Sequence, residues 1–97
     1  MINILVTLEV KDFNMLSIFE GKAAEIMRSH GGDIIRAFET FRNEDRSGQE
    51  IHLLEFPSEA AFSEYRSDSR LLEIAELREK AIVSMKVVKS DKLKNYA

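Results

Sequence analysis

The chain contains two histidines, and one of them stands where it could do chemistry. His52 interrupts the aliphatic run Ile51-His52-Leu53-Leu54, so its ring must find a hydrogen-bond partner inside an otherwise apolar strand. Imidazole exchanges its proton near neutral pH, which makes His52 the candidate catalytic residue, as an acid or a base in a cleft. A buried histidine with a satisfied hydrogen bond and no catalytic role is the alternative.

Three further polar side chains are candidates for binding a ligand near His52. Tyr65 and Arg78 each border the apolar stripe of a predicted helix, so each can extend a polar tip into a cleft. Arg36, on a predicted strand, can contact an anion from the side of the sheet. For the two arginines the alternative is an ion pair with one of the 17 acidic residues. For Tyr65 it is an aromatic side chain at the edge of the core.

Other kinds of site are not expected. His30 ends a predicted helix, where a donor can meet unsatisfied carbonyls, and the two histidines lack the spacing of a metal site. There is no cysteine and no Gly-x-Ser-x-Gly sequence, and the four glycines cannot form a phosphate-binding or dinucleotide loop. The sequence therefore predicts no metal and no cofactor.

The composition is that of one globular domain spanning residues 1–97. Apolar residues make up 44% of the chain and charged residues 32%, with a net charge of −3. This balance offers no attraction to nucleic acid or to an anionic membrane, and no apolar run approaches the ~20 residues of a membrane helix. The absence of cysteine fits a reducing compartment, and residues 1–9 resemble a strand rather than a signal sequence. We expect a cytoplasmic protein.

The hydrophobic pattern predicts the element order βαββαβ. Strands are expected at 2–10, 33–42, 49–56 and 82–89, and a helix at about 13–30 that begins after Asp12 and ends at Gly31-Gly32. The second helical region comprises a short helix that Ser58 caps, which runs through residue 66, and a helix from about 69 to 81. The usual fold for this order is a ferredoxin-like α+β domain, with a four-stranded antiparallel sheet in the order 4-1-3-2 and the helices on one face.

The sheet face without helices is expected to be apolar. Strand 49–56 carries apolar side chains on both parities, Ile51 and Leu53 on one and Leu54 and Phe56 on the other. Uncovered, such a face would be an exposed apolar patch, so the pattern predicts a homodimer in which two sheets pack together. We expect His52 on the helix-facing parity; the reverse parity would place it in the dimer interface. RNA-recognition domains share this element order but carry aromatic side chains where Ile51 and Leu53 stand, which argues against RNA binding.

Short segments over nearly the whole chain match a known sequence pattern. They are Phe19-Glu20, Ala23-Ala24, Ile26-Met27, His30-Gly31-Gly32, Ile51-His52-Leu53-Leu54-Glu55-Phe56-Pro57, Ala60-Ala61-Phe62, Tyr65-Arg66-Ser67-Asp68, Leu77-Arg78-Glu79 and Ala81-Ile82. In these segments the chain resembles the DUF1330 family. This family lies within the dimeric α/β-barrel superfamily of the antibiotic-biosynthesis monooxygenases. The resemblance implies a ferredoxin-like protomer that pairs through its sheet and has a cleft between sheet and helices. The superfamily includes cofactor-free monooxygenases, heme-degrading enzymes and isomerases, so the resemblance selects no reaction.

Two hypotheses about function follow. In the first, a homodimer binds a small organic molecule in the cleft beside the four candidate residues, either as a binding protein or as a cofactor-independent monooxygenase or isomerase. In the second, the chain is a non-catalytic dimeric interaction module. An open cleft with converging polar groups would favour the first hypothesis. A cleft filled by aromatic side chains would favour the second, the candidates being Phe19, Phe38, Phe56 and Phe62.

Overall fold

The structure is a computed structural model, in which residues 1–96 are described. The elements along the chain are β1 (Ile2–Val10), α1 (Phe13–Ser29), β2 (Asp33–Arg42), β3 (Gly48–Phe56), α2 (Glu59–Arg66), α3 (Ser69–Glu73), α4 (Ala75–Ala81) and β4 (Ile82–Ser90). The strands form one antiparallel four-stranded sheet in the order β2-β3-β1-β4. This is the predicted ferredoxin-like α+β fold with the predicted strand order.

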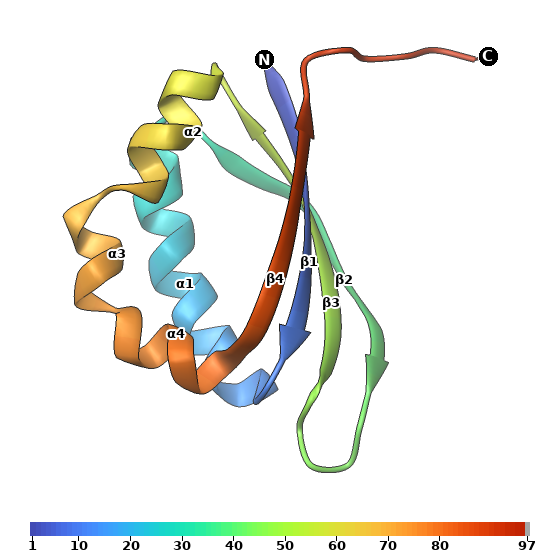
Figure 1. Cartoon of the computed structure of the whole chain (residues 1–97), viewed down its shortest axis with the longest axis vertical. Helices are drawn as coiled ribbons and strands as arrows, with labels where there is room; N and C mark the ends of the chain where they lie inside the picture. The colour runs from blue at the N-terminus through green and yellow to red at the C-terminus, as the bar shows by residue number, and fades with distance from the viewer. Residues whose placement is uncertain (97) are drawn as a thin grey trace.

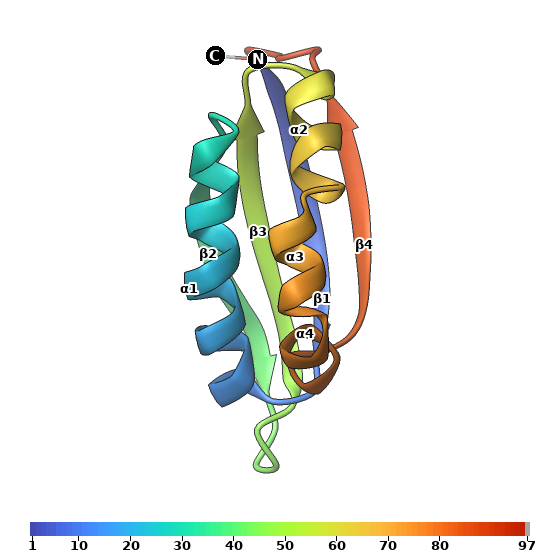
Figure 2. The ribbon, with the colours of Figure 1, turned by 90° about the vertical axis from the view of Figure 1, so that its left-hand side faces the viewer.

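All the helices lie on one face of the sheet, and the opposite face carries none (Figure 1). Seen from the helix side, α1 runs alongside the consecutive helices α2, α3 and α4 (Figure 2). No helix within residues 1–96 is both long enough and apolar enough to span a membrane.

Helix α1 begins and ends as the sequence predicts. The side chain of Asp12 accepts hydrogen bonds from two backbone N–H groups of the first turn, at 2.8 and 3.3 Å. After the last turn, Gly31 adopts a φ of 79°, in the left-handed region that favours glycine. A Cβ atom at this position would lie 2.8 Å from Cγ of Pro57, so the turn has no room for a side chain.

The predicted helix at 69–81 is wrong in one respect, because it is divided at Ile74 into α3 and α4. Ile74 has φ −109° and ψ 17°, and its N–H donates to the carbonyl of Leu71 at 3.2 Å, a tighter turn that ends α3. A β-branched side chain also lowers the preference for helix at this point. Leu71, Ile74 and Leu77 all pack against the core, so the predicted apolar stripe is present although the helix is not continuous.

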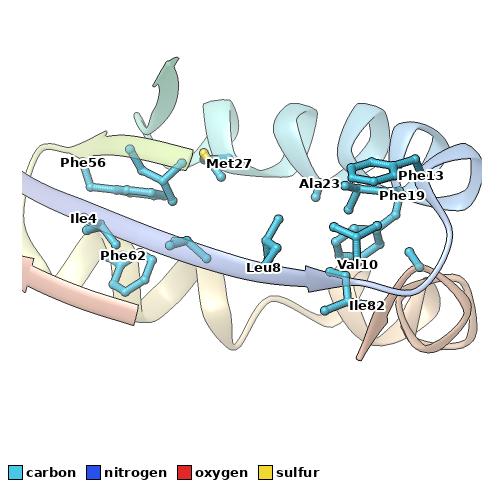
Figure 3. Close-up of a cluster of buried hydrophobic side chains, with 14 of the residues drawn as sticks. Ile4, Leu8, Val10, Phe13, Phe19, Ala23, Met27, Phe56, Phe62 and Ile82 are labelled. Carbon is cyan, nitrogen blue, oxygen red and sulfur yellow. The ribbon is translucent and has the colours of Figure 1, made fainter. Parts of the chain in front are cut away.

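The core lies between the sheet and the helices, as the side chains in Figure 3 show. Alternate residues of β1 point into it, together with one stripe of α1 and the helix-facing side of β3. The largest fully buried side chains are those of Phe56, Ile4, Leu8 and Val10. Among the described residues, His52 is the single buried side chain that is not hydrophobic, with 4% of its surface exposed.

The face without helices carries an apolar row across its middle, but polar side chains surround this row, among them Thr7, Glu55 and Lys86. Leu5 pairs with Leu53 on one side and Val88 on the other, and the three side chains form a row across adjacent strands. Leu5 is 41% exposed and Val88 is 49% exposed, and Phe38 on β2 is 54% exposed. On β3, His52, Leu54 and Phe56 are buried on the side that faces the helices. This confirms the prediction that His52 points toward the helices.

Candidate functional site

A cleft with a volume of about 290 Å³ lies between the helix-facing side of the sheet and the helices. Its apolar walls come from the three strands β1, β3 and β4 and from the helices; they include Val6, Leu8, Leu54, Met85, Val87, Phe19, Phe62 and Leu71. The polar side chains that line it are Glu20, His52, Tyr65, Arg66 and Arg78. An apolar cleft with a few converging polar groups is the usual form of a small-molecule site, and this one is at the small end of the range.

The aromatic side chains do not fill this cleft. Phe19 and Phe62 form part of its lining, and Phe56 lies in the core beneath it. Phe38 lies on the opposite face of the sheet, since it pairs with Ile51. The open cleft is the arrangement that favours a ligand-binding protein over a purely structural module.

His52 is held at the base of the cleft by a neighbour on its own strand. Strand residues two apart point to the same face, and Nε2 of His52 lies 2.5 Å from Oε2 of Glu50. Burial by itself would lower the pKa of His52, but the hydrogen bond to Glu50 and the charges of Glu20 and Glu50 outweigh it, so the pKa is raised above 6.5. His52 is therefore a stronger base than an isolated imidazole.

The hydrogen bond to Glu50 also decides which ring nitrogen is available. A carboxylate accepts a hydrogen bond, so in neutral His52 the proton is assigned to Nε2. Nδ1 then carries the lone pair that can accept a proton. A histidine oriented and polarised by a carboxylate is the usual arrangement of a general base in proteins.

Glu20 brings a second titratable group into the same cleft. It extends from α1, and burial raises its pKa above 4.5; the neighbouring His52 opposes this rise and Glu50 adds to it. Its carboxyl group is therefore near enough to both β3 residues for their charges to affect its protonation. The cleft holds one imidazole and one carboxyl group whose proton affinities are both raised.

Tyr65 lies beside Glu20 and at the edge of the aromatic core. Its ring centroid is 5.5 Å from that of Phe56 and 6.4 Å from that of Phe62. Burial raises the pKa of its hydroxyl to about 12, with a further contribution from Glu20. Tyr65 thus stays protonated at neutral pH. It is an aromatic residue at the edge of the core and also a hydrogen-bond donor at the cleft, so both interpretations made from the sequence apply.

Arg66 and Arg78 stand at the mouth of the cleft. Both are exposed, and both lower the pKa of the Tyr65 hydroxyl, against the effect of burial. Cζ of Arg66 lies 5.6 Å from the centre of the Phe62 ring. Within residues 1–96 neither guanidinium group forms an ion pair with a carboxylate, so the alternative considered for Arg78 is absent there.

The expectation that Arg36 reaches the cleft is wrong. Arg36 pairs with Leu53, whose side chain lies on the face without helices, and it is not among the residues that line the cleft. The cause is an irregularity in β2 between Ile34 and Arg36. The extra residue reverses the alternation, so Ile34 points toward the helices and Arg36 points away.

His30 lies outside the cleft and has a structural role, as expected, but with a different partner. Its Nε2 is 2.8 Å from Oδ2 of Asp68, and its ring meets that of Tyr65 edge to face at 6.4 Å. The sequence had suggested that His30 would meet the carbonyls at the end of α1. The side chain instead connects the end of α1 to the cap of α3.

Three polar residues of the site were missed from the sequence: Glu20, Glu50 and Arg66. Glu50 could have been found from the sequence Glu50-Ile51-His52, because residues two apart on a strand share a face. Glu20 stands on the apolar stripe of α1, four residues after Leu16, which is an unusual place for a carboxylate.

Within residues 1–96 no three histidine or carboxylate side chains are grouped so as to hold a metal ion.

Comparisons with known proteins agree with this fold. The family described as "Domain of unknown function (DUF1330)" matches residues 3–91. Among solved structures, a protein of unknown function from Rhodopseudomonas palustris has 17% identity and a TM-score of 0.76, and the match covers 97% of this chain and 83% of that one. A protein from Agrobacterium tumefaciens has 21% identity and a TM-score of 0.69, with 97% and 95% covered.

Enzymes are among the similar structures. SnoaB, a cofactor-independent oxygenase from Streptomyces nogalater, has 10% identity and a TM-score of 0.72, and the match covers 98% of this chain and 95% of that one. The similar structures also include an antibiotic biosynthesis monooxygenase and an uncharacterized NIPSNAP domain protein from Burkholderia xenovorans. Among the curated proteins, no relative matches this sequence.

Proposed function

The chain belongs to the DUF1330 family, and from that starting point we propose that it binds a small organic molecule in the cleft and removes a proton from it, with His52 as the general base. The observation that carries this proposal is His52, which is buried at the base of an open, mostly apolar cleft and hydrogen-bonded to the half-buried Glu50. A buried titratable group that lines a cleft and has a charged partner is a typical feature of an active site.

The proton transfer needs only groups of this chain. Glu50 holds the proton on Nε2 of His52, so Nδ1 accepts a proton from the bound molecule, and the positive charge that forms is stabilised by Glu50. The apolar walls exclude water and favour a ligand with a hydrocarbon body. A deprotonated substrate can then isomerise, or it can react with dioxygen as in a cofactor-independent oxygenase.

The proposal includes a homodimer formed through the sheet face without helices. The row formed by the exposed Leu5 and Val88 and the half-buried Leu53, together with the exposed Phe38, is the type of apolar patch that marks an interaction surface. Two sheets packed there would leave both clefts open, because the clefts lie on the helix-facing side of each sheet. A non-catalytic dimeric module remains the competing function, and the cleft is what distinguishes the two.

The test is native mass spectrometry of protein purified gently from its cells, with a matched pair of variants. Ala75 lines the cleft, so Ala75→Trp fills it, whereas Ala60→Trp adds the same side chain to an exposed position of α2. We expect the wild type and Ala60→Trp to carry a bound small molecule on a dimer, and Ala75→Trp to carry none. A small molecule retained equally by all three proteins would disprove binding in the cleft.

The role of His52 is tested separately with the molecule so identified. His52→Gln keeps a polar side chain of similar size, so it should bind the molecule but lose its turnover by about 10²-fold or more. Turnover that survives in this variant would exclude His52 as the base. Binding without turnover in the wild type would instead support the non-catalytic function.

A further inference from the structure

Besides His52, the cleft contains the carboxyl group of Glu20 and two arginines that have no carboxylate partner within residues 1–96. Together these groups indicate the chemical class of the substrate. The polar lining is ordered by depth: His52 is buried, Glu20 and Tyr65 are half-buried, and Arg66 and Arg78 are exposed at the mouth. A molecule that enters the cleft therefore meets a cationic group first, a hydroxyl and a carboxyl next, and the imidazole last.

The two arginines select for an anion at the mouth. Within residues 1–96 neither has a carboxylate partner, and both are close enough to the Tyr65 hydroxyl to lower its pKa. Guanidinium groups bind carboxylates through paired hydrogen bonds, and the Tyr65 O–H is a further donor to the same oxygen atoms. An organic acid fits this end of the cleft.

Glu20 and His52 both line the cleft, Glu20 from α1 and His52 from β3. Each affects the protonation of the other. Burial raises the pKa of Glu20, so its carboxyl group holds a proton more readily than an exposed glutamate, while Nδ1 of His52 is not used by the hydrogen bond to Glu50. A proton donor and a proton acceptor in one apolar cleft are the two groups that an isomerisation by proton transfer needs.

On the basis of the proposed function, we propose that the substrate is an enolisable carbonyl acid with an apolar body and that Glu20 is a second catalytic residue, the proton donor to the carbonyl oxygen. His52 takes the proton from the carbon next to the carbonyl, and the C–H electron pair becomes a C=C bond. The C=O π pair moves to oxygen, which takes the proton of Glu20. The product is the enol, an isomer of the substrate, and no oxidant or reductant is consumed.

The cycle closes when the two residues exchange their protons. After the step His52 holds the proton from carbon and Glu20 is ionised, and each returns to its starting state by exchange with water or by the reverse transfer. The same groups therefore catalyse the conversion of enol to ketone. This arrangement favours isomerisation over oxygenation, because the deprotonated substrate is neutralised at its oxygen as it forms.

Phenylpyruvate is a suitable probe because its groups follow the order of the cleft. It carries a carboxylate, then a ketone, then an acidic CH₂ group, then a phenyl ring for the apolar wall. Two measurements report the reaction: the ultraviolet absorbance of its enol, and exchange of its CH₂ protons for deuterium in D₂O by NMR. We expect the wild type to accelerate both and to saturate with the probe.

The variants separate the roles of the residues. His52→Gln and Glu20→Gln should each lower kcat by about 10²-fold with little change in KM, because both act on the transferred protons. The double variant Arg66→Gln with Arg78→Gln should raise KM by roughly tenfold, about 1.4 kcal/mol, and spare kcat. Glu25→Gln and Arg28→Gln, exposed positions of α1 outside the cleft, are the matched controls and should behave as the wild type.

The pH profile distinguishes a proton donor from a residue that only supports the site. The rate of the wild type should be bell-shaped, with its maximum where Glu20 and His52 hold one proton between them. The groups that face this pair are Glu50 from β3, Tyr65 and Arg66 from α2, and Arg78 from α4. Glu20→Gln cannot lose a proton, so the fall on the alkaline side should disappear from its residual activity.

Other results would overturn the inference. If phenylpyruvate is converted and His52→Gln is inactive but Glu20→Gln is unchanged, Glu20 is not the donor, although His52 is still a base as proposed above. If the wild type neither binds nor converts the probe, the substrate class is wrong. The proposed function does not depend on that result, because native mass spectrometry tests separately whether the cleft retains a small molecule. Failure of the substrate class can therefore be told apart from failure of the proposed function.

Discussion

The imidazole of His52 and the carboxyl group of Glu50 lie on the same face of β3, with 2.5 Å between Nε2 and Oε2. This contact determines the charge of the only histidine in the cleft, because burial of the ring favours its neutral form and the carboxylate favours the protonated form. The raised pKa of His52 shows that the carboxylates prevail.

Glu50→Gln should therefore lower the pKa of His52. An amide gives the ring a much weaker stabilisation of its charged form, so burial becomes the dominant effect. The measurement is an NMR titration of the imidazole C–H signals. Glu55→Gln, on the same strand but on the opposite face, is the control and should leave the titration of His52 unchanged. If the pKa of His52 were unaltered in Glu50→Gln, Glu50 would not be stabilising the protonated form of His52.

The same contact predicts how stability changes with pH. Because the pKa of His52 is higher in the folded state, its contribution to the free energy of unfolding is complete below about 6.5, the pKa of an unperturbed histidine. It is lost as the pH rises through the folded pKa. His52→Gln should remove this decline, as measured by urea unfolding at several pH values. A wild type whose stability is constant over this range would contradict the assignment.

Two glycines of the α1 region should respond to alanine in opposite ways. Gly31 has a φ of 79° and a Cβ there would press on Pro57, so Gly31→Ala should lower the free energy of unfolding by about 1–2 kcal/mol. Gly21 lies within α1 with nothing within 4 Å of an added Cβ, so Gly21→Ala should raise it by about 0.5–1 kcal/mol. Urea unfolding of both variants, made in the same background, measures the two changes. Equal effects of the two substitutions would contradict this account of the turn.

The sequence predicts the elements of this fold well because their signals are local. Asp12 and Gly31 bound α1, and alternation of apolar residues defines β1 and β3, so the order and the sheet topology follow from general rules. The parity of β3 follows as well, since His52, Leu54 and Phe56 share one face.

The site is only partly predictable, because it depends on register and on distant contacts. His52, Tyr65 and Arg78 do meet in one cleft. Arg36 does not, since one extra residue near Ile34 reverses the alternation of β2, and no pattern in the sequence marks it. Glu20 becomes significant only when α1 is packed over β3, which brings its carboxyl group near His52.

A charge on the open sheet face should separate the proposed dimer. Leu5 lies in the middle of the apolar row between Leu53 and Val88, so a lysine there would be buried against the partner's sheet without a counter-charge. Leu5→Lys should change the mass measured by light scattering from dimer to monomer. Ile18→Lys, on α1 and also exposed, adds the same charge on the helix side and should leave the mass unchanged. A monomeric wild type would refute the pairing.

Asp68 joins the end of α1 to the start of α3, and this connection should be sensitive to acid. Its Oδ2 accepts hydrogen bonds from Nε2 of His30 and from Nη2 of Arg70, both at 2.8 Å, and Arg70 also donates to Ser29 at 2.7 Å. Hydrogen bonds from Arg70 and His30 hold the pKa of Asp68 well below its ordinary value. The charged form is thus bound more strongly in the folded protein than in the unfolded chain.

A depressed pKa contributes stability above the ordinary pKa of aspartate, about 3.9, and this contribution is lost as the pH falls through the folded pKa. Asp68→Asn should therefore have a lower Tm than the wild type at pH 7, and the difference should shrink as the pH falls from about 4 to 2. Thermal unfolding followed by circular dichroism measures both. Asp91→Asn, which changes an exposed carboxylate beyond β4, is the control and should follow the wild type. A Tm difference for Asp68→Asn that does not depend on pH would show that the lost contacts matter and that the charge of Asp68 does not.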